Sequence, residues 1–151
     1  MIDQVMIKPI TADYQDEAKG LVLEGMKERF GFIDHTLNPD LNILCAHYSK
    51  RGNAFYIGFI DNNLICTGAL TKECTTTGRI ERMSVKKAYR RNGIAQLMLE
   101  HLELKAKQLG YSKIVLETNQ LWNSAITFYK KNGFKVDFQE NERIHFFKKM
   151  Q

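Results

Sequence analysis

A short polar turn between two apolar segments carries the residue types that bind phosphate. The turn consists of Arg90, Arg91, Asn92, Gly93, Ile94 and Ala95. It follows a strand-like segment at residues 80–85 and precedes a helix-like segment at residues 94–109. At such a junction the first backbone N–H groups of the helix lack intrahelical partners and lie at the positive end of the helix dipole. Gly93 lets a phosphate approach the backbone and the arginines add charge, so the turn predicts a pyrophosphate site.

A second string decides between this reading and an ordinary tight turn that binds nothing. It reads Ala125-Ile126-Thr127-Phe128-Tyr129-Lys130-Lys131-Asn132-Gly133-Phe134 and follows at the distance of one helix plus one strand. Together the two strings resemble the GNAT superfamily of N-acetyltransferases. Arg90, Gly93 and Ala95 match the family's Q/R-x-x-G-x-G/A acetyl-CoA motif, and residues 125–134 match its A-x-x-F-Y-x-x-x-G-F signature. The resemblance spans roughly residues 64–134.

The resemblance implies direct transfer of the acetyl group of acetyl-CoA, as co-substrate, to a primary amine. An alkyl amine with a pKa of ~10.4 is deprotonated in only about one in 10³ molecules at pH 7, so a base or a water relay is needed. We expect Glu81 to be that base, although many family members carry the glutamate two positions earlier, where this chain has Arg79. Strict strand alternation would place Glu81 on the same face as Arg79 and Met83. The alternative is that Glu81 forms a surface ion pair with an arginine.

The reaction has two further requirements, which the strand before the turn and the second string are expected to meet. The developing oxyanion requires a fixed donor, which in the family is a main-chain N–H of that strand, here Met83, Ser84 or Val85. The same strand edge would pair with the pantetheine arm. Tyr129 occupies the position of the family's acid, which protonates the departing thiolate. Its alternative is a half-buried helix tyrosine, and we expect Phe128 and Ile126 to be core residues.

The match has one gap, at an asparagine that hydrogen-bonds the cofactor in many relatives. Trp122 stands at that position in this chain. Either Asn119 or Asn123 could take its place, and we favour Asn119 because it directly follows the strand-like segment at residues 114–118. Trp122 is then a packing residue.

Hydrophobic periodicity predicts the elements that position these residues. Strands are expected at residues 5–9, 55–60, 64–70, 80–85, 114–118, 134–138 and 144–147. Helices are expected after Thr11, from Pro39 to near Arg51 and Gly52, and at residues 94–109 and 125–132. The order is βααβββαβαββ. It predicts an α/β (α+β) fold with a mixed, mostly antiparallel sheet of about seven strands and helices on both faces, as in the GNAT fold. Residues 1–151 are expected to form a single N-acetyltransferase domain.

Composition limits the other classes of function. The 151 residues are 44% hydrophobic and 26% charged, with no membrane span and no signal peptide, which predicts a cytoplasmic globular protein. The net charge of +5 is spread along the chain without interleaved aromatic residues, which disfavours nucleic acid as a partner. Cys45, Cys66 and Cys74 have neither disulfide nor zinc spacing, so we expect packing residues and no metal.

The acceptor amine cannot be read from the sequence. In this fold the residues that contact it come from the first two helices and nearby loops, here about residues 30–38 and the turn at 71–77. Phe30, Phe32 and Ile33 suggest an apolar wall, or else core packing. The resemblance leaves open whether the chain is a homodimer. It also leaves open a second function, a non-catalytic acetyl-CoA-binding sensor or interaction module of the same fold.

Overall fold

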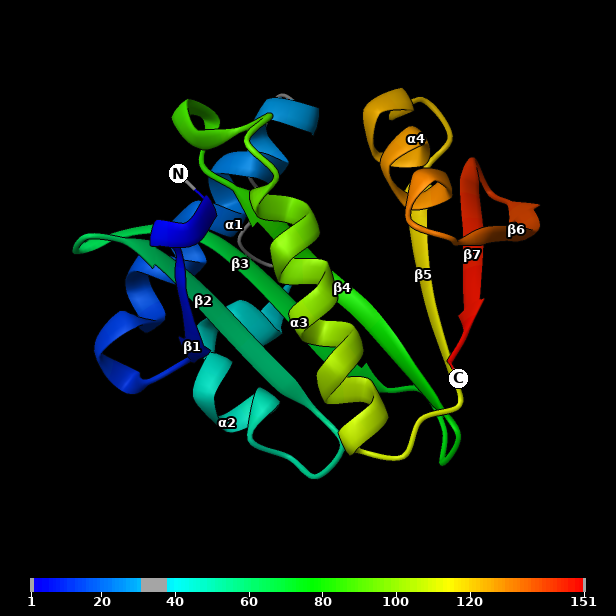
Figure 1. Ribbon diagram of the computed structural model, residues 1–151, viewed down its shortest axis with the longest axis horizontal. Helices are drawn as coiled ribbons and strands as arrows, with labels where there is room; N and C mark the ends of the chain where they lie inside the picture. Colours follow the sequence, from blue (N-terminus) through cyan, green and yellow to red (C-terminus); the bar gives the residue numbers. More distant parts are fainter. Residues whose placement is uncertain (1, 31–37, 151) are drawn as a thin grey trace.

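A seven-stranded sheet forms the centre of the computed structural model, which describes residues 2–30 and 38–150, with Arg29 and Phe30 described by their backbone only. The strand order is β1-β2-β3-β4-β5-β7-β6 (Figure 1). The strands are β1 (Met6–Pro9), β2 (Ala54–Ile60), β3 (Asn63–Lys72), β4 (Thr77–Val85), β5 (Lys113–Asn119), β6 (Lys135–Glu140) and β7 (Arg143–Lys149). Among the described residues β4 and β5 form the one parallel pair. The prediction of a mixed, mostly antiparallel sheet is therefore confirmed.

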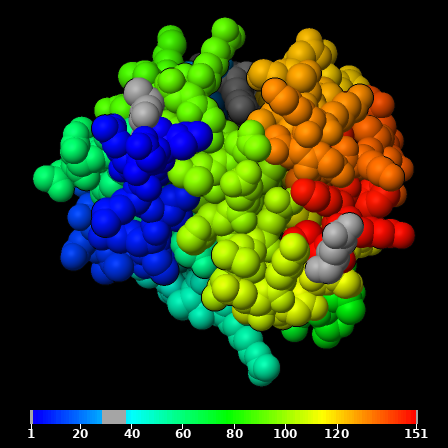
Figure 2. All heavy atoms as spheres, viewed as in Figure 1, coloured from blue at the N-terminus to red at the C-terminus, as the bar shows by residue number. Residues whose placement is uncertain are grey.

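Helices cover both faces of this sheet, because each face presents alternate apolar side chains. The helices are α1 (Gln15–Phe30), α2 (Leu44–Tyr48), α3 (Ile94–Gln108) and α4 (Asn123–Lys131), with 3-10 turns η1 (Ile2–Gln4), η2 (Ala12–Tyr14), η3 (Pro39–Asn42) and η4 (Lys87–Tyr89). One core joins α3 and α4 to the sheet, and a second core on the other face joins α1 and α2 to it. Figure 2 shows α3 at the centre of its face, between the N-terminal segment and α4. The expected element order is confirmed.

The prediction of one helix from Pro39 to near Arg51 and Gly52 is wrong, since the structure has two shorter elements and the second ends at Tyr48. The segment is divided into η3 and α2 at Ile43, whose φ of −139° and ψ of 46° are not helical. The Cys45 N–H donates to the side-chain carbonyl of Gln15 at 2.9 Å, so a tertiary hydrogen bond replaces the helical bond to Leu41. Sequence periodicity could not predict this break, because the residue that accepts the Cys45 hydrogen bond lies in α1.

The two central strands β4 and β5 stay together over only part of their length. Their parallel ladder covers Thr77–Arg79 opposite Lys113–Val115. Beyond it, β5 continues beside β7 as far as Asn119, while β4 continues beside β3 as far as Val85. The edge of β4 that faces β5 is thus left without ladder partners from Ile80 onward, and the strands diverge toward the start of α3 (Figure 1).

No helix within residues 2–30 and 38–150 is both long enough and apolar enough to cross a membrane.

Candidate functional site

A bulge in β4 decides which of its side chains reach each face of the sheet. The β3–β4 register shifts between Thr67 and Ala69, and Arg82 has a φ of +56°. The Thr67 hydroxyl donates to the Arg82 carbonyl at 2.7 Å and holds the bulge in place. Beyond it, Met83 packs against the core under α3, whereas the Glu81 side chain lies on the α1/α2 face. The prediction that Glu81 and Met83 share a face is wrong, because one inserted residue reverses the alternation.

Glu81, the expected base, is hydrogen-bonded to a tyrosine of α2. Its Oε1 accepts a hydrogen bond from the Tyr48 hydroxyl at 2.7 Å. Burial, followed by the negative charge of Glu81, raises the pKa of Tyr48, so the phenol stays protonated and remains a donor. The alternative of a surface arginine pair is not what the structure shows, since Arg79 pairs with Glu73 at 2.6 Å and the adjacent Arg82 pairs with Asp40 at 2.8 Å. The Glu81 carboxylate therefore lies on the α1/α2 face with the Tyr48 hydroxyl as its hydrogen-bond donor.

The open edge of β4 presents backbone N–H groups toward β5. Lys86 N–H donates to the Ile65 carbonyl at 2.8 Å, so Lys86 faces β3. Backbone groups alternate along a strand, which directs the Ser84 N–H to β3 and the Met83 and Val85 N–H groups to the open side. The Val85 carbonyl agrees with this direction, because it accepts a hydrogen bond from Arg90 outside the sheet. Of the three residues expected to offer a main-chain donor, Met83 and Val85 have outward N–H groups.

The predicted phosphate turn leads directly into α3 and leaves its first amides without partners. Gly93 has a φ of +80° and is the N-cap, with no side-chain cap. The first helical hydrogen bond is from Leu97 N–H to the Gly93 carbonyl, at 3.1 Å. The N–H groups of Ile94, Ala95 and Gln96 have no acceptor within residues 2–30 and 38–150. Together with the helix dipole, these amides are groups that can bind an anion, so the geometry is compatible with the predicted phosphate site.

The side chain of Asn92 closes this turn. Its Nδ2 donates to the carbonyls of Tyr89 and Arg90, at 3.1 and 3.0 Å. The amide therefore fixes the turn's conformation from within.

The two arginines of the turn have different surroundings. The Arg90 guanidinium binds Glu28 of α1 through two hydrogen bonds of 2.7 and 3.2 Å, while its Nε donates to Val85. Its charge is therefore offset by Glu28, and the side chain ties the turn to α1 and β4. Arg91 is exposed and has a φ of +63°, and its guanidinium has no partner in the part of the chain that the structure describes. Arg91 is the arginine with charge available to an anion.

Tyr129 lies near the end of α4, with its ring in the core beneath that helix. The ring is 8% exposed and makes an edge contact with Phe134 at 5.5 Å between centroids. Phe128 and Ile126 also pack against this core, as predicted. Tyr129 therefore lies on the same side of the sheet as Met83, whereas Glu81 lies on the other.

The two asparagines considered as substitutes have different roles. The Asn119 side-chain carbonyl accepts a hydrogen bond from Leu121 N–H at 2.9 Å, so it stabilises the turn that starts α4. Its Nδ2 has no acceptor among the described residues and remains the group able to contact a ligand. Asn123 is exposed at the first position of α4, and Trp122 is the N-cap of that helix.

Sequence reasoning missed Thr118, whose hydroxyl is buried and lacks a partner. Its Oγ1 has no hydrogen-bond partner in the described structure, and the residue is 3% exposed. By alternation with Ile114 and Leu116, it faces the α3/α4 side, at the stretch where β5 has left β4. An unsatisfied buried hydroxyl costs about 1–3 kcal/mol, so such a group is a candidate ligand contact. The sequence did contain a signal for this residue, because alternation along an apolar strand places the threonine at a core-facing position.

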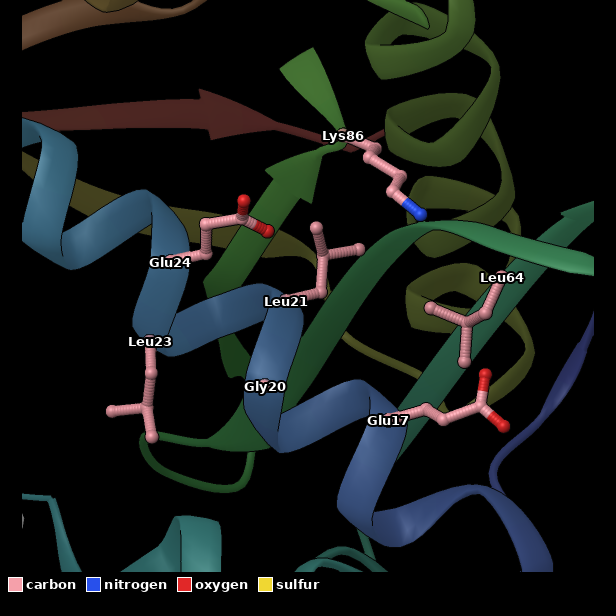
Figure 3. Close-up of a pocket in the computed structure, with 7 residues that line it drawn as sticks. All are labelled: Glu17, Gly20, Leu21, Leu23, Glu24, Leu64 and Lys86. Atoms are coloured by element: carbon pink, nitrogen blue, oxygen red, sulfur yellow. The ribbon is translucent and has the colours of Figure 1, made fainter. Parts of the chain in front are cut away.

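Other features do not contribute to this site. A hollow of about 470 Å³ between α1 and β3 is lined by Glu17, Gly20, Leu21, Leu23, Glu24, Leu64 and Lys86 (Figure 3). It contains none of the predicted site residues. Among the described residues, no group of three or more His, Cys, Asp or Glu side chains could hold a metal ion.

The cysteines differ in exposure, and the prediction that all three are packing residues is wrong for Cys74. Cys66 is buried, whereas Cys74 is exposed in the β3–β4 turn. Hydrogen bonds from Thr76 and Thr77 lower the pKa of Cys74 to about 7, and burial raises the pKa of Cys66 to about 12. A turn that places two threonines beside one thiol was not visible in the cysteine spacing.

These pKa directions predict selective alkylation by iodoacetamide. The thiolate is the nucleophile, so the Cys74 rate should rise with pH, reach half its maximum near pH 7, and then level off. Cys66 should stay unmodified in the folded protein. Peptide mapping by mass spectrometry at a series of pH values measures both sites, with Cys74→Ser as the control. A Cys74 rate still at a few per cent of its maximum at pH 7 would contradict the hydrogen bonds.

Comparison with known proteins agrees with this geometry. The family model of the acetyltransferase (GNAT) domain matches residues 51–136. A probable N-acetyltransferase 14 from Xenopus tropicalis is 34% identical over 102 residues, covering 66% of this chain and 49% of the relative. The chain spans about half the length of the curated relatives it matches.

Solved structures show the same fold. A GNAT-family acetyltransferase from Staphylococcus aureus Mu50 has a TM-score of 0.88 at 23% identity, covering 97% of this chain and 99% of that one. The PaiA N-acetyltransferase from Thermoplasma acidophilum, solved in complex with coenzyme A, has a TM-score of 0.84 at 20% identity, covering 96% and 98%.

Proposed function

Because the chain belongs to the GNAT acetyltransferase family, we propose that it transfers the acetyl group of acetyl-CoA directly to a primary amine. The proposal is carried by the amides at the start of α3, which have no acceptor among the described residues and lie next to the open edge of β4. The proposal treats residues 1–151 as one N-acetyltransferase domain, since both cores pack against one sheet. The cytoplasmic location stays a prediction.

The groups available to bind acetyl-CoA fit its chemistry. The N–H groups of Ile94, Ala95 and Gln96 and the charge of Arg91 suit the pyrophosphate. The outward N–H groups along the β4 edge suit the amide carbonyls of the pantetheine arm, in the manner of an added strand. Across the gap, β5 contributes the unpartnered hydroxyl of Thr118.

The two faces of the sheet then supply different parts of the reaction. On the α1/α2 face, Glu81 takes the proton as the amine nitrogen bonds to the thioester carbon. The outward N–H of Met83 or Val85 stabilises the charge that develops on the carbonyl oxygen. The carbon–sulfur bond breaks, and the thiolate takes the Tyr129 proton from the α3/α4 side. A phenol has a pKa of ~10 and a thiol a pKa of ~8.5. Because this difference is small, the last proton transfer costs only about 2 kcal/mol.

The test is CoA release from acetyl-CoA with a panel of polyamines, aminoglycosides, amino acids and amino-terminal peptides. We expect release with at least one amine, and a loss on the order of 10²-fold in Glu81→Gln, because the base is removed. Thiol detection should use a Cys74→Ser background, since the exposed Cys74 would react with the reagent. Tight acetyl-CoA binding without release would instead support the sensor function, and the absence of binding would contradict both functions.

A further inference from the structure

We propose that Tyr48 is a positioning residue for Glu81, held for this role by an ion pair between Asp40 and Arg82. This inference rests on the proposed function, in which Glu81 is the base. The Tyr48 hydroxyl lies 2.7 Å from Glu81 Oε1 and 3.0 Å from Asp40 Oδ2. Tyr48 is 3% exposed, so solvent does not compete strongly for its hydroxyl.

The surrounding charges direct the single Tyr48 proton to Glu81. Arg82 binds both oxygens of Asp40, from NH2 at 2.8 Å and from Nε at 3.1 Å, and also the side-chain carbonyl of Asn38 at 3.0 Å. The Asp40 and Arg82 side chains are only 13% and 19% exposed. Asp40 thus has its charge offset by a fork of two hydrogen bonds and is the weaker acceptor for the phenol. Glu81 has the shorter contact and accepts the hydrogen bond, while the proton stays on the Tyr48 oxygen.

Other titratable groups near Glu81 do not replace this contact. Arg79 lies on the same strand and interacts with Glu81 through charge, but its guanidinium hydrogen-bonds Glu73 at 2.6 and 3.2 Å. The Arg82 guanidinium hydrogen-bonds both carboxylate oxygens of Asp40. Tyr48 is therefore the described side chain that donates directly to Glu81.

The arrangement suits both protonation states of the base. While Glu81 is a carboxylate, the phenol donates a hydrogen bond to it and holds it on the α1/α2 face of the sheet. When the amine N–H bond breaks and an O–H bond forms on Glu81, the new O–H can donate to the Tyr48 oxygen. The phenol then rotates its own hydrogen to Asp40, which is already within reach at 3.0 Å. No proton leaves Tyr48, whose pKa is raised by burial.

The first experiment measures kcat and KM separately for Tyr48→Phe, using an amine that gives CoA release. Loss of the hydrogen bond that orients the Glu81 carboxylate should lower kcat about 10-fold and leave the KM for acetyl-CoA unchanged, the size expected for one hydrogen bond to a charged group. Site-specific 3-fluorotyrosine at position 48, which keeps the hydroxyl in nearly the same shape, should retain kcat. A loss in kcat alone that the fluorotyrosine rescues separates positioning from a purely structural role. Tyr56→Phe is the matched control, since Tyr56 is buried on the other face against His101.

The second experiment needs no acceptor. In protein labelled with ¹³C at glutamate carboxyls, the Glu81 signal is assigned by its loss in Glu81→Gln and compared at pH 7 in wild type, Tyr48→Phe and Tyr56→Phe. We expect its chemical shift to change in Tyr48→Phe alone, because the carboxylate loses its hydrogen-bond donor. An unchanged Glu81 chemical shift together with an unchanged kcat in Tyr48→Phe would overturn the inference. Full turnover of Glu81→Gln would instead reject Glu81 as the base, and the positioning role with it.

Discussion

Tyr129→Phe is expected to lower turnover on the order of 10²-fold while leaving acetyl-CoA affinity unchanged. The substitution removes only the hydroxyl, and the ring contacts with Phe134 and Phe146 remain. Without the phenol, the thiolate must leave unprotonated or wait for water. Measuring kcat by CoA release and Kd by calorimetry separates the chemical step from binding.

Tyr111→Phe is the control for this prediction. The Tyr111 hydroxyl donates to the Gly52 carbonyl at 2.7 Å, near the end of β4 that is remote from the phosphate turn. Its loss should cost about 1 kcal/mol of stability and leave turnover unchanged. Turnover that stays the same in Tyr129→Phe would remove Tyr129 from the mechanism.

Gly93→Ala should weaken CoA binding about 10–10²-fold, the size expected from losing one or two hydrogen bonds to a charged phosphate. The residue has a φ of +80°, and an added Cβ would lie 2.6 Å from Cδ1 of Ile2. That contact is with the end of a flexible side chain and can relax. The larger effect is that the methyl group and the altered turn move the phosphate away from the amides of α3.

Gly110→Ala provides a matched control for backbone strain. Gly110 ends α3 with a φ of +86°, and a Cβ there would meet nothing within 4 Å. Both variants should lose similar stability, about 1–2 kcal/mol from the left-handed conformation, whereas Gly93→Ala alone should lose affinity. Equal CoA affinities in the two variants would refute the anion site at the start of α3.

Local patterns explain why much of the fold was predictable. Strand and helix periodicities repeat within a few residues, and Gly93 and Gly133 mark helix ends at positions where φ is indeed positive. The order of the eleven main elements, the mixed sheet and the start of α3 at Ile94 follow from such patterns. The break at Ile43 did not follow, because the Gln15 side chain that replaces a helical hydrogen bond is 30 residues away.

The candidate site was predictable in part, for the same reason. Its motif residues lie in two strings, and the structure places one at the open end of β4 and the other in α4. The predictions for Phe32, Ile33 and the side chain of Phe30 concern groups that lie outside the described residues. Arg90 was expected to add positive charge for the phosphate, but its guanidinium is paired with Glu28, 62 residues earlier in the chain.

The sequence by itself determined the family, the order of elements and the glycine turn that starts α3, because these depend on residues that are neighbours in the chain. The tertiary structure decided the face on which Glu81 lies, through the bulge at Arg82. It also decided that Tyr48, 33 residues away, is the hydrogen-bond partner of Glu81, and that the Thr118 hydroxyl has no partner among the residues that the structure describes. Alternation along a strand is local, but a bulge and a long-range hydrogen bond are set by the packing of whole elements against one another.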